Sequence, residues 1–372
     1  MGHRGGGTMG GGSGGTTGTG GGTTGTSGGT TTTAAGTTAT GGMTGGGMGG
    51  GGMGSACYVY PGTPPTPGKV TPDITFRRGI YMQGSMRMDN GASVTIWGFT
   101  DGGGMGMMGG SFPSPAIRVT EGQIVHTILS VDMMWMHTIH HHGIEPSTEN
   151  DGVGHFSHDV YNGTYTYQWR ASHAGTYFYH CHTNTVLHAE MGMYGALIVD
   201  PQPTPGDPAG TKRAFYNGPI YDVEAIWACD EIDPAWHNKD WAAGTCGGDV
   251  GLHNLNPKYF IITGVDGANS ALTDPRVAVN MTVGQTLLVR YINAGYYPQS
   301  IDFGGLTATV VGSDGRPLTV PWVTNSIEAS SAERYDCIFQ PTTTGTFTVT
   351  VQFFHWITGN VLGTARTRIN VA

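Results

Sequence analysis

The sequence predicts an all-β protein of two sandwich domains behind a segment rich in glycine and threonine. Short runs of β-branched and aromatic residues recur along most of the chain, and Gly, Pro, Asn and Asp separate them. No long helical period of apolar residues interrupts this pattern. A chain of 372 residues is long enough for two domains of ordinary size.

The N-terminal segment differs in composition from the rest of the chain. Residues 1–56 are almost wholly Gly, Thr, Ser and Ala. Such a stretch has too little apolar surface to offset the entropy lost on ordering. We therefore expect residues 1–68 to form a flexible tether, or a glycine-rich segment that packs only in an assembly. Turn and polyproline residues at 60–68 end it.

The remaining chain divides at a proline-rich linker, residues 201–212. The first predicted sandwich covers residues 69–200, with strands expected at 93–97, 116–119, 124–129, 165–169, 176–179 and 196–199. The second covers residues 213–372, with strands expected at 259–263, 286–293, 307–311, 334–339, 346–354 and 365–371.

Charge and cysteine content restrict the partners and the compartment. The formal net charge of −9 argues against nucleic acid and anionic membrane surfaces. No apolar run approaches the ~18 residues of a membrane span. Cys229 and Cys246 bracket one loop and are the expected disulfide, which leaves Cys57 and Cys337 as a long-range pair. We expect a periplasmic, extracellular or cell-surface protein, although the numbered sequence opens without a secretory signal.

The most informative segment is 176–198, which carries a set of soft metal ligands. Cys181 offers a thiolate, His188 an imidazole and Met193 a thioether. A thiolate, two imidazoles and a weak axial methionine make up a blue-copper electron-transfer site. The histidine-rich stretch 137–142 supplies the second imidazole, which we assign to His137. The rival axial ligand is Met191.

Two further motifs resemble those of a known family. His140-His141-His142-Gly143 resembles the His-x-His-Gly element of multicopper oxidases, and His180-Cys181-His182 resembles their second His-x-His element. Residues 115–122 and 191–199 resemble the opening and closing strands of their first cupredoxin domain. The resemblance runs through roughly 70–372 and implies two Greek-key cupredoxin sandwiches that bind copper.

The histidine count departs from a complete multicopper oxidase. In that family, eight imidazoles from two domains hold three coppers that reduce dioxygen. The first domain here offers four matching positions, His140, His142, His180 and His182. The second offers only three unpaired histidines, His237, His253 and His355. We therefore do not expect one kind of chain to build the complete three-copper centre.

Copper nitrite reductases fit this count better, since they are two-domain cupredoxin trimers with a second copper between subunits. The resemblance implies that His142 and His180 bind this copper together with His355 of a neighbouring chain. The peptide between His180 and Cys181 would connect the two sites. An ordinary half-buried strand histidine is the alternative for His355.

The match to nitrite reductases also fails in places. The position of their catalytic aspartate holds His140, and residues 302–306 lack their catalytic histidine. We assign His140 and His182 as catalytic residues and further ligands of a nitrogen-rich copper site, type 2 or multinuclear. His141 is expected to point away, because alternate strand residues face opposite sides.

These features predict a copper-dependent oxidoreductase that passes electrons from a type 1 copper to a histidine-bound interfacial copper. We expect a homotrimer with an unidentified electron donor and a small substrate such as dioxygen or nitrite. Neither a nucleic-acid partner nor a membrane span is expected. The alternatives are a non-enzymatic type 1 copper carrier and a surface protein whose Gly/Thr segment drives assembly.

Overall fold

The computed structural model describes residues 70–102, 110–154, 156–245 and 249–372. Strands dominate this part of the chain, and α1 (Thr185–Glu190) is the α-helix within it. The predicted all-β fold class is confirmed. The predicted N-terminal segment, residues 1–68, lies outside the described residues. No helix in the described ranges is long and apolar enough to cross a membrane.

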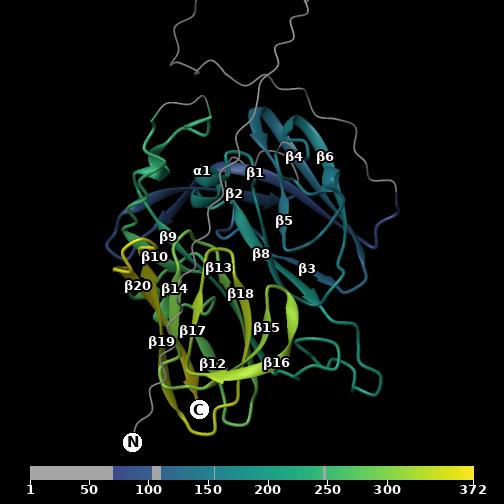
Figure 1. Cartoon of the computed structure of the whole chain (residues 1–372), viewed down its shortest axis with the longest axis vertical. Helices are drawn as coiled ribbons and strands as arrows, with labels where there is room; N and C mark the ends of the chain where they lie inside the picture. The colour runs from purple at the N-terminus through teal and green to yellow at the C-terminus, as the bar shows by residue number, and fades with distance from the viewer. Residues whose placement is uncertain (1–69, 103–109, 155, 246–248) are drawn as a thin grey trace, which may run out of the picture. The chain divides into compact units, whose positions relative to one another are not determined.

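The first half of the chain forms two four-stranded sheets (Figure 1). One has the order β2 (Ser93–Asp101), β1 (Ile74–Arg87), β4 (Ile124–His137) and β6 (Val160–Arg170). The other has the order β3 (Ile117–Thr120), β8 (Tyr194–Asp200), β7 (Gly175–His180) and β5 (His140–His142). Side chains of both sheets, such as Leu129 and Tyr179, share one buried core. Burial of the apolar faces holds the two sheets together as a sandwich.

The second half forms a larger pair of sheets. The seven-stranded sheet has the order β11 (Val265–Asp266), β10 (Tyr259–Ile262), β9 (Val223–Ile232), β13 (Leu287–Asn293), β18 (Arg334–Phe339), β15 (Ala308–Ser313) and β16 (Arg316–Thr324). The five-stranded sheet has the order β12 (Val279–Met281), β20 (Val361–Val371), β19 (Gly345–Phe354), β14 (Gln299–Asp302) and β17 (Ser326–Ala329). Trp227 and Phe353 belong to the core between them.

Every strand expected from the sequence is present, but several strands were not predicted. The longest of these is β1, whose apolar pattern is broken by arginines and glycines. Arg78 is nevertheless 1% exposed, because its guanidinium donates hydrogen bonds to Asp101 and to the Tyr179 hydroxyl. A buried charge that is paired and hydrogen-bonded can occupy a core position, and a polarity pattern alone does not reveal such pairing.

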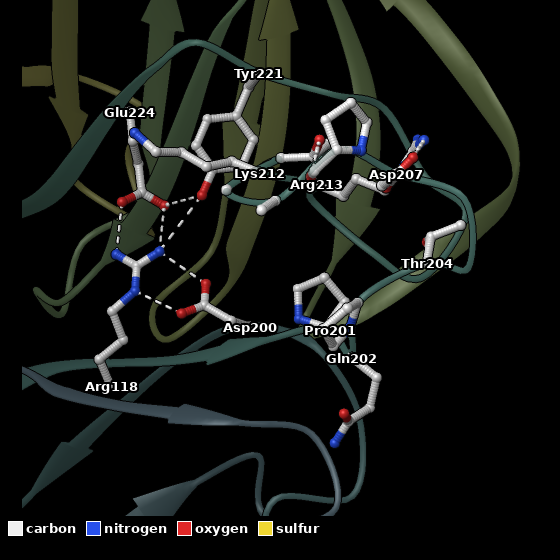
Figure 2. A pocket seen from close by; sticks show the side chains of 15 residues that line it. Arg118, Asp200, Pro201, Gln202, Thr204, Asp207, Lys212, Arg213, Tyr221 and Glu224 are labelled. Carbon is white, nitrogen blue, oxygen red and sulfur yellow. Dashed lines mark hydrogen bonds and ion pairs between the residues drawn. The ribbon is translucent and has the colours of Figure 1, made fainter.

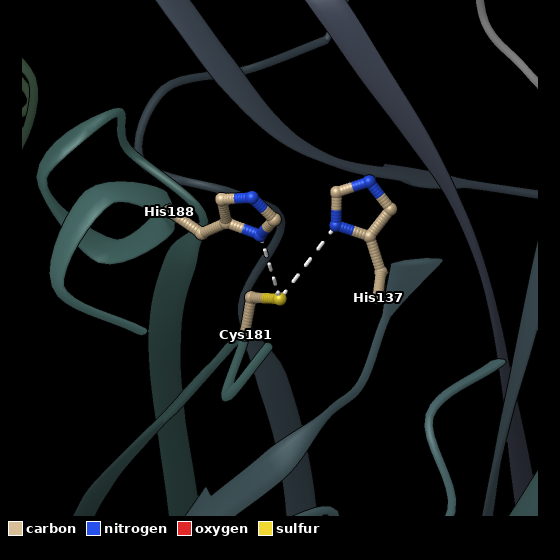
Figure 3. A group of neighbouring side chains, drawn as sticks. All are labelled: His137, Cys181 and His188. Atoms are coloured by element: carbon tan, nitrogen blue, oxygen red, sulfur yellow. Dashed lines mark hydrogen bonds between the residues drawn. The ribbon is translucent and has the colours of Figure 1, made fainter. Parts of the chain in front are cut away.

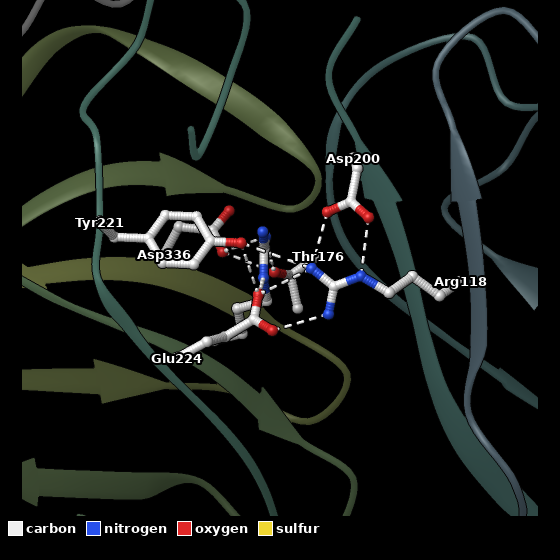
Figure 4. Close-up of polar contacts among 7 residues, drawn as sticks. Arg118, Thr176, Asp200, Tyr221, Glu224 and Asp336 are labelled. Atoms are coloured by element: carbon white, nitrogen blue, oxygen red, sulfur yellow. Dashed lines mark hydrogen bonds and ion pairs between the residues drawn. The ribbon is translucent and has the colours of Figure 1, made fainter. Parts of the chain in front are cut away.

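A network of charged residues joins the two sandwiches (Figure 4). Glu224 on β9 accepts hydrogen bonds from Arg118 on β3 at 2.6 Å and from Arg290 on β13 at 2.6 Å. Arg118 also donates to Asp200 at 2.7 Å. Arg290 is fully buried and donates in addition to Thr176 of the first sandwich at 3.1 Å. These contacts tie β3 and β7 to the second half of the chain.

The expected disulfide between Cys229 and Cys246 is not supported. Cys229 is a free, buried thiol, and Cys337 is another, so the pairing of Cys337 with Cys57 is not formed either. Both thiols lie in the apolar core of the second sandwich, and burial raises the pKa of each. Cys246 and Cys57 lie outside the described residues. Small buried cysteines of this kind act as apolar core residues.

Candidate metal centres

Three predicted ligands meet in the core of the first sandwich (Figure 3). His137 ends β4, Cys181 directly follows β7, and His188 lies on α1. The Cys181 Sγ atom is 3.6 Å from Nδ1 of His137 and 3.4 Å from Nδ1 of His188. All three side chains are fully buried. Their ligand atoms lie within 4.8 Å of one another, which is close enough to hold one metal ion.

A hydrogen bond orients His188 toward this common point. Nε2 of His188 lies 3.0 Å from the Trp241 carbonyl oxygen, to which it donates. The proton therefore sits on Nε2, and the Nδ1 lone pair faces the sulfur. The Cys181 amide donates to the Met193 carbonyl at 3.0 Å. Met193 and Met191 are both fully buried in the same core.

The protonation states of this group suit a cation. Burial lowers the pKa of His188 to about 4 and keeps the pKa of His137 well below its usual value. Burial also raises the pKa of the Cys181 thiol to about 12. Neutral imidazoles and a buried thiol provide no charge of their own, whereas a coordinated metal ion would deprotonate the thiol and stabilise the thiolate. The donor set therefore fits copper.

A second group lies on the outer face of β5 and β7. These strands pair antiparallel, with His140 opposite His180 and His142 opposite Phe178. Directly opposite residues share a face of the sheet, so all four rings project to the same side. Ligand atoms of His140, His142 and His180 lie within 4.8 Å of one another, and His142 Nδ1 is 3.3 Å from His180 Nε2.

His141 faces the opposite side of β5, as predicted. It is 1% exposed, and its Nε2 lies 2.9 Å from the Thr127 hydroxyl. Its ring also contacts Trp169, with 4.8 Å between ring centroids. His141 is therefore part of the sandwich core and not of the histidine cluster.

In two rings of the cluster, Nδ1 is hydrogen-bonded to a backbone carbonyl oxygen. His140 Nδ1 lies 2.8 Å from the Asp151 carbonyl oxygen, and His180 Nδ1 lies 2.9 Å from that of Cys181. In each ring this leaves Nε2 as the unprotonated ligand atom. Burial lowers the pKa of His142 to about 3 and keeps the pKa of His180 far below its usual value. Unprotonated imidazoles are the form that binds metals.

Comparison with known proteins finds copper proteins and oxidases similar to this chain. The family model of multicopper oxidases matches residues 94–204. Copper resistance protein A of Pseudomonas syringae pv. tomato is 28% identical over 263 residues, which are 63% of this chain and 42% of that protein. L-ascorbate oxidase of Cucumis sativus is 38% identical over 123 residues, which are 31% of this chain and 18% of that protein.

Solved structures extend the likeness to both sandwiches. The blue copper oxidase of Nitrosomonas europaea superposes with a TM-score of 0.62 at 25% identity, covering 80% of this chain and 86% of that chain. The chain is therefore similar to multicopper oxidases, through a matched domain at residues 94–204 and a shared fold over both sandwiches. The copper nitrite reductase of Nitrosomonas europaea shares the fold, with a TM-score of 0.58 at 18% identity and coverage of 80% and 93%.

The match to the multicopper oxidase family model implies copper as the cofactor. The chain spans less than half the length of the first curated relatives it matches, 42% and 43%. Its likeness to the blue copper oxidase of Nitrosomonas europaea is more complete, since it covers 86% of that chain.

Two other predicted residues lie apart from the tight groups. The His182 ring centroid is 5.5 Å from that of His140 and 5.7 Å from that of His180, so His182 lies beside the cluster. Its Nδ1 contacts the Thr185 hydroxyl at 3.1 Å. His355 follows β19 in the second sandwich, with its ring 5.8 Å from that of Tyr297. Among the described residues of a single chain, neither ligand group includes His355.

Sequence reasoning missed several residues that support these groups. A cavity of about 360 Å³ beside His182 is lined in part by Asp159 and Thr183. The Thr183 hydroxyl donates to Asp159 at 2.6 Å, and burial raises the pKa of Asp159. Trp97 lies edge-on to His188, with 5.5 Å between ring centroids. None of these residues lies in a recognisable motif, so the sequence held no signal for them.

A larger cavity, about 540 Å³, lies beside the linker (Figure 2). Arg118, Asp200, Glu224 and Tyr221 contact one another along its wall. The remaining arginine, Arg213, is bonded to Asp207 at 2.6 Å. Both arginines are thus already paired with carboxylates. The third cation of the lining, Lys212, lies over the Tyr221 ring, with 5.9 Å from Nζ to the ring centroid.

Proposed function

We propose that this protein is a copper-dependent oxidoreductase in which His137, Cys181, His188 and Met193 would hold a type 1 copper. The observation that carries the proposal is the position of Cys181. Its sulfur lies between two inward-facing imidazole nitrogens, at 3.4 and 3.6 Å. When bound, copper would supply a one-electron redox centre there.

The second copper in this proposal is held by His140, His142 and His180, with His182 beside them. His180 and His182 flank Cys181 in sequence, so each is one peptide unit away from the thiolate. This covalent connection supports electron transfer between the two sites. The neighbouring cavity of about 360 Å³ has room for a small oxygen-containing substrate such as dioxygen or nitrite.

We propose that a homotrimer completes the second site with His355 from a neighbouring chain. His355 lies on a turn beside Trp356 and Ile357, each 71% exposed. Apolar side chains this exposed favour contact with another protein surface. A head-to-tail contact of this kind closes as a ring. We also propose a periplasmic or extracellular location, which rests on the copper chemistry alone because the expected disulfide is not formed.

Copper counting and spectroscopy test this function. Purified, copper-loaded protein should hold about two coppers per chain and show the strong absorption of a thiolate bound to copper. The variant Cys181→Ser should lose this absorption and about one copper per chain, while its circular dichroism stays that of the wild type. Retention of the colour by Cys181→Ser would overturn the type 1 assignment. One copper per chain and no turnover would identify an electron carrier.

A further inference from the structure

One aromatic ring connects the histidine cluster to a buried cation. Phe178 lies 4.7 Å from His142 and 5.3 Å from His180, measured between ring centroids, and its plane is within 21° and 28° of theirs. The guanidinium carbon of Arg334 lies 6.0 Å from the centroid of the same ring. Phe178 is on β7, whereas Arg334 is on β18 of the second sandwich. The second half of the same chain thus places a positive charge beside the cluster.

Arg334 is held firmly in this position. Its Nη1 atom donates to the Ala332 carbonyl oxygen at 2.6 Å. Gly143, which directly follows His142, leaves the space that the guanidinium occupies. A Cβ atom at position 143 would lie 2.6 Å from Nη2 of Arg334, and the φ angle of +87° there is itself unfavourable for other residues. The arginine therefore packs directly against the backbone that carries a cluster ligand.

The charge of Arg334 is only partly compensated. Its side chain is 5% exposed, whereas that of its ion-pair partner Asp314, at 3.0 Å, is 47% exposed and therefore screened by water. Its Nε atom is buried without a hydrogen-bond partner among the described residues. Burial lowers the pKa of Arg334 despite the carboxylates nearby. After burial, the charge of Arg334 is the largest cause that lowers the pKa of His142.

We propose that Arg334 sets the reduction potential of the copper held by His140, His142 and His180. A fixed positive charge repels Cu²⁺ more strongly than Cu⁺, so it favours the reduced state. The Cys181 sulfur lies in the buried apolar core of the first sandwich. Arg334 thereby directs electrons toward the histidine cluster. The proposal rests on the proposed function only in taking these three histidines as copper ligands.

Two carboxylates face the cluster from its other side. Asp151 lies 3.3 Å from His140 Nδ1, and Asp159 acts electrostatically on His182. Both come from the chain between β5 and β6 and belong to the first sandwich. They offset part of the positive charge, but they do not depend on the second sandwich. Arg334 is therefore the group through which the second half of the chain acts on the cluster.

Substitutions of Arg334 and Asp314 separate an electrostatic role from a structural one. Metal-free full-length variants would be titrated with Cu²⁺ against a chelator, with the thiolate absorption marking the type 1 site so that the histidine cluster is measured separately. Arg334→Met should bind Cu²⁺ at the cluster roughly tenfold more tightly than wild type, since repulsion is removed. Asp314→Asn should bind it more weakly. Arg334→Lys should stay close to wild type, as should the exposed control Arg276→Met.

The sign of the change decides the outcome. Weaker Cu²⁺ binding in both Arg334→Met and Arg334→Lys would show a structural role and overturn the proposal, as would an unchanged affinity in Arg334→Met. If Arg334→Met fails to fold, Asp314→Asn still tests the sign, because strengthened binding there contradicts the electrostatic role. If the Cu²⁺ affinities change as expected but the protein shows no turnover or forms no trimer, only the proposed function is overturned. A wild-type cluster that takes up no Cu²⁺ overturns both.

Discussion

The Nε2 atom of His188 lies 3.0 Å from the carbonyl oxygen of Trp241. His188 belongs to the first sandwich, whereas Trp241 belongs to the chain between β9 and β10, which we term the capping segment (residues 233–245 and 249–258). Trp236, Trp241, Leu252 and Leu255 of this segment pack against the core around Cys181. The nitrogen of His188 that faces away from the sulfur is therefore covered by the second half of the chain.

Because the capping segment covers His188, we expect small reductants to reach the type 1 site slowly. Asn184 donates two hydrogen bonds to this segment, to the carbonyl oxygens of Trp241 and Ala243, both at 3.0 Å. Asn184→Gly removes both bonds and tolerates the left-handed backbone at φ 43°. Opening of the segment should become easier by about 2 kcal/mol.

Stopped-flow bleaching of the blue band by a small inorganic reductant would measure this effect. Asn184→Gly should be reduced faster than wild type with its absorption maximum unchanged. Asn238→Gly, in the same segment, serves as the control, because Asn238 is exposed and bonds only to Pro234. Equal rates in wild type and Asn184→Gly would contradict a covering role.

The motifs that carry the metal ligands could be predicted from the sequence, because several ligands lie close together within residues 137–142 and within residues 180–193. His137 and Cys181 come from separate strands, yet the spacing of soft ligands around Cys181 already pointed to copper. Alternation along β5 correctly placed His141 on the core side. These predictions needed only short-range geometry.

Contacts between the two halves of the chain could not be predicted in this way. Trp241 lies 53 positions from His188, and its role is played by a backbone carbonyl, which any residue type possesses. The contact of Arg334 with Phe178 likewise depends on how the two sandwiches pack. Cys229 misled the prediction, since Cys229 and Cys246 bracket one loop and suggested a disulfide where the fold uses a buried thiol.

His355 offers a test of the trimeric site. His355→Ala should lower the copper content by about one per chain and abolish turnover, because one ligand of the interfacial copper is lost. The blue absorption should persist, since no type 1 ligand changes. His253→Ala is the control, because the His253 side chain is 71% exposed and belongs to neither ligand group. An unchanged copper count in His355→Ala, or a monomer in solution, would exclude the interfacial site.

Because Glu231 is buried, we expect the protein to lose stability as the pH rises from about 4.5 to about 8. It is fully buried, and burial together with the neighbouring Glu190 raises its pKa to about 8 from an ordinary value of 4.5. The folded protein therefore keeps the proton where the unfolded chain has released it. This stabilisation is fully present below about pH 4.5 and is lost as pH rises through about 8.

Replacement of Glu231 by glutamine should remove this dependence. In thermal denaturation of the metal-free protein, Glu231→Gln should match wild type at acidic pH and exceed its stability above pH 8. Glu328→Gln, at an exposed position, should follow the wild-type curve throughout. A Glu231→Gln curve that falls with pH as steeply as that of wild type would show that another group controls alkaline stability.

We expect the Glu224 carboxylate to stabilise the contact between the sandwiches. Its carboxylate bridges Arg118, whose side chain is 42% exposed, and Arg290, which is fully buried. Although burial opposes ionisation, the two arginines lower the pKa of Glu224 to about 2. The stabilisation by the ionised carboxylate is therefore present above about pH 4.5 and is lost as the pH falls toward 2.

Glu224→Gln leaves a buried guanidinium undercompensated and should lower the free energy of unfolding by about 3–5 kcal/mol. Arg118→Met removes only the solvent-exposed partner and should cost less than about 1 kcal/mol. Urea denaturation at pH 7 measures both values, and equal losses in the two variants would contradict the central role of the Glu224–Arg290 pair.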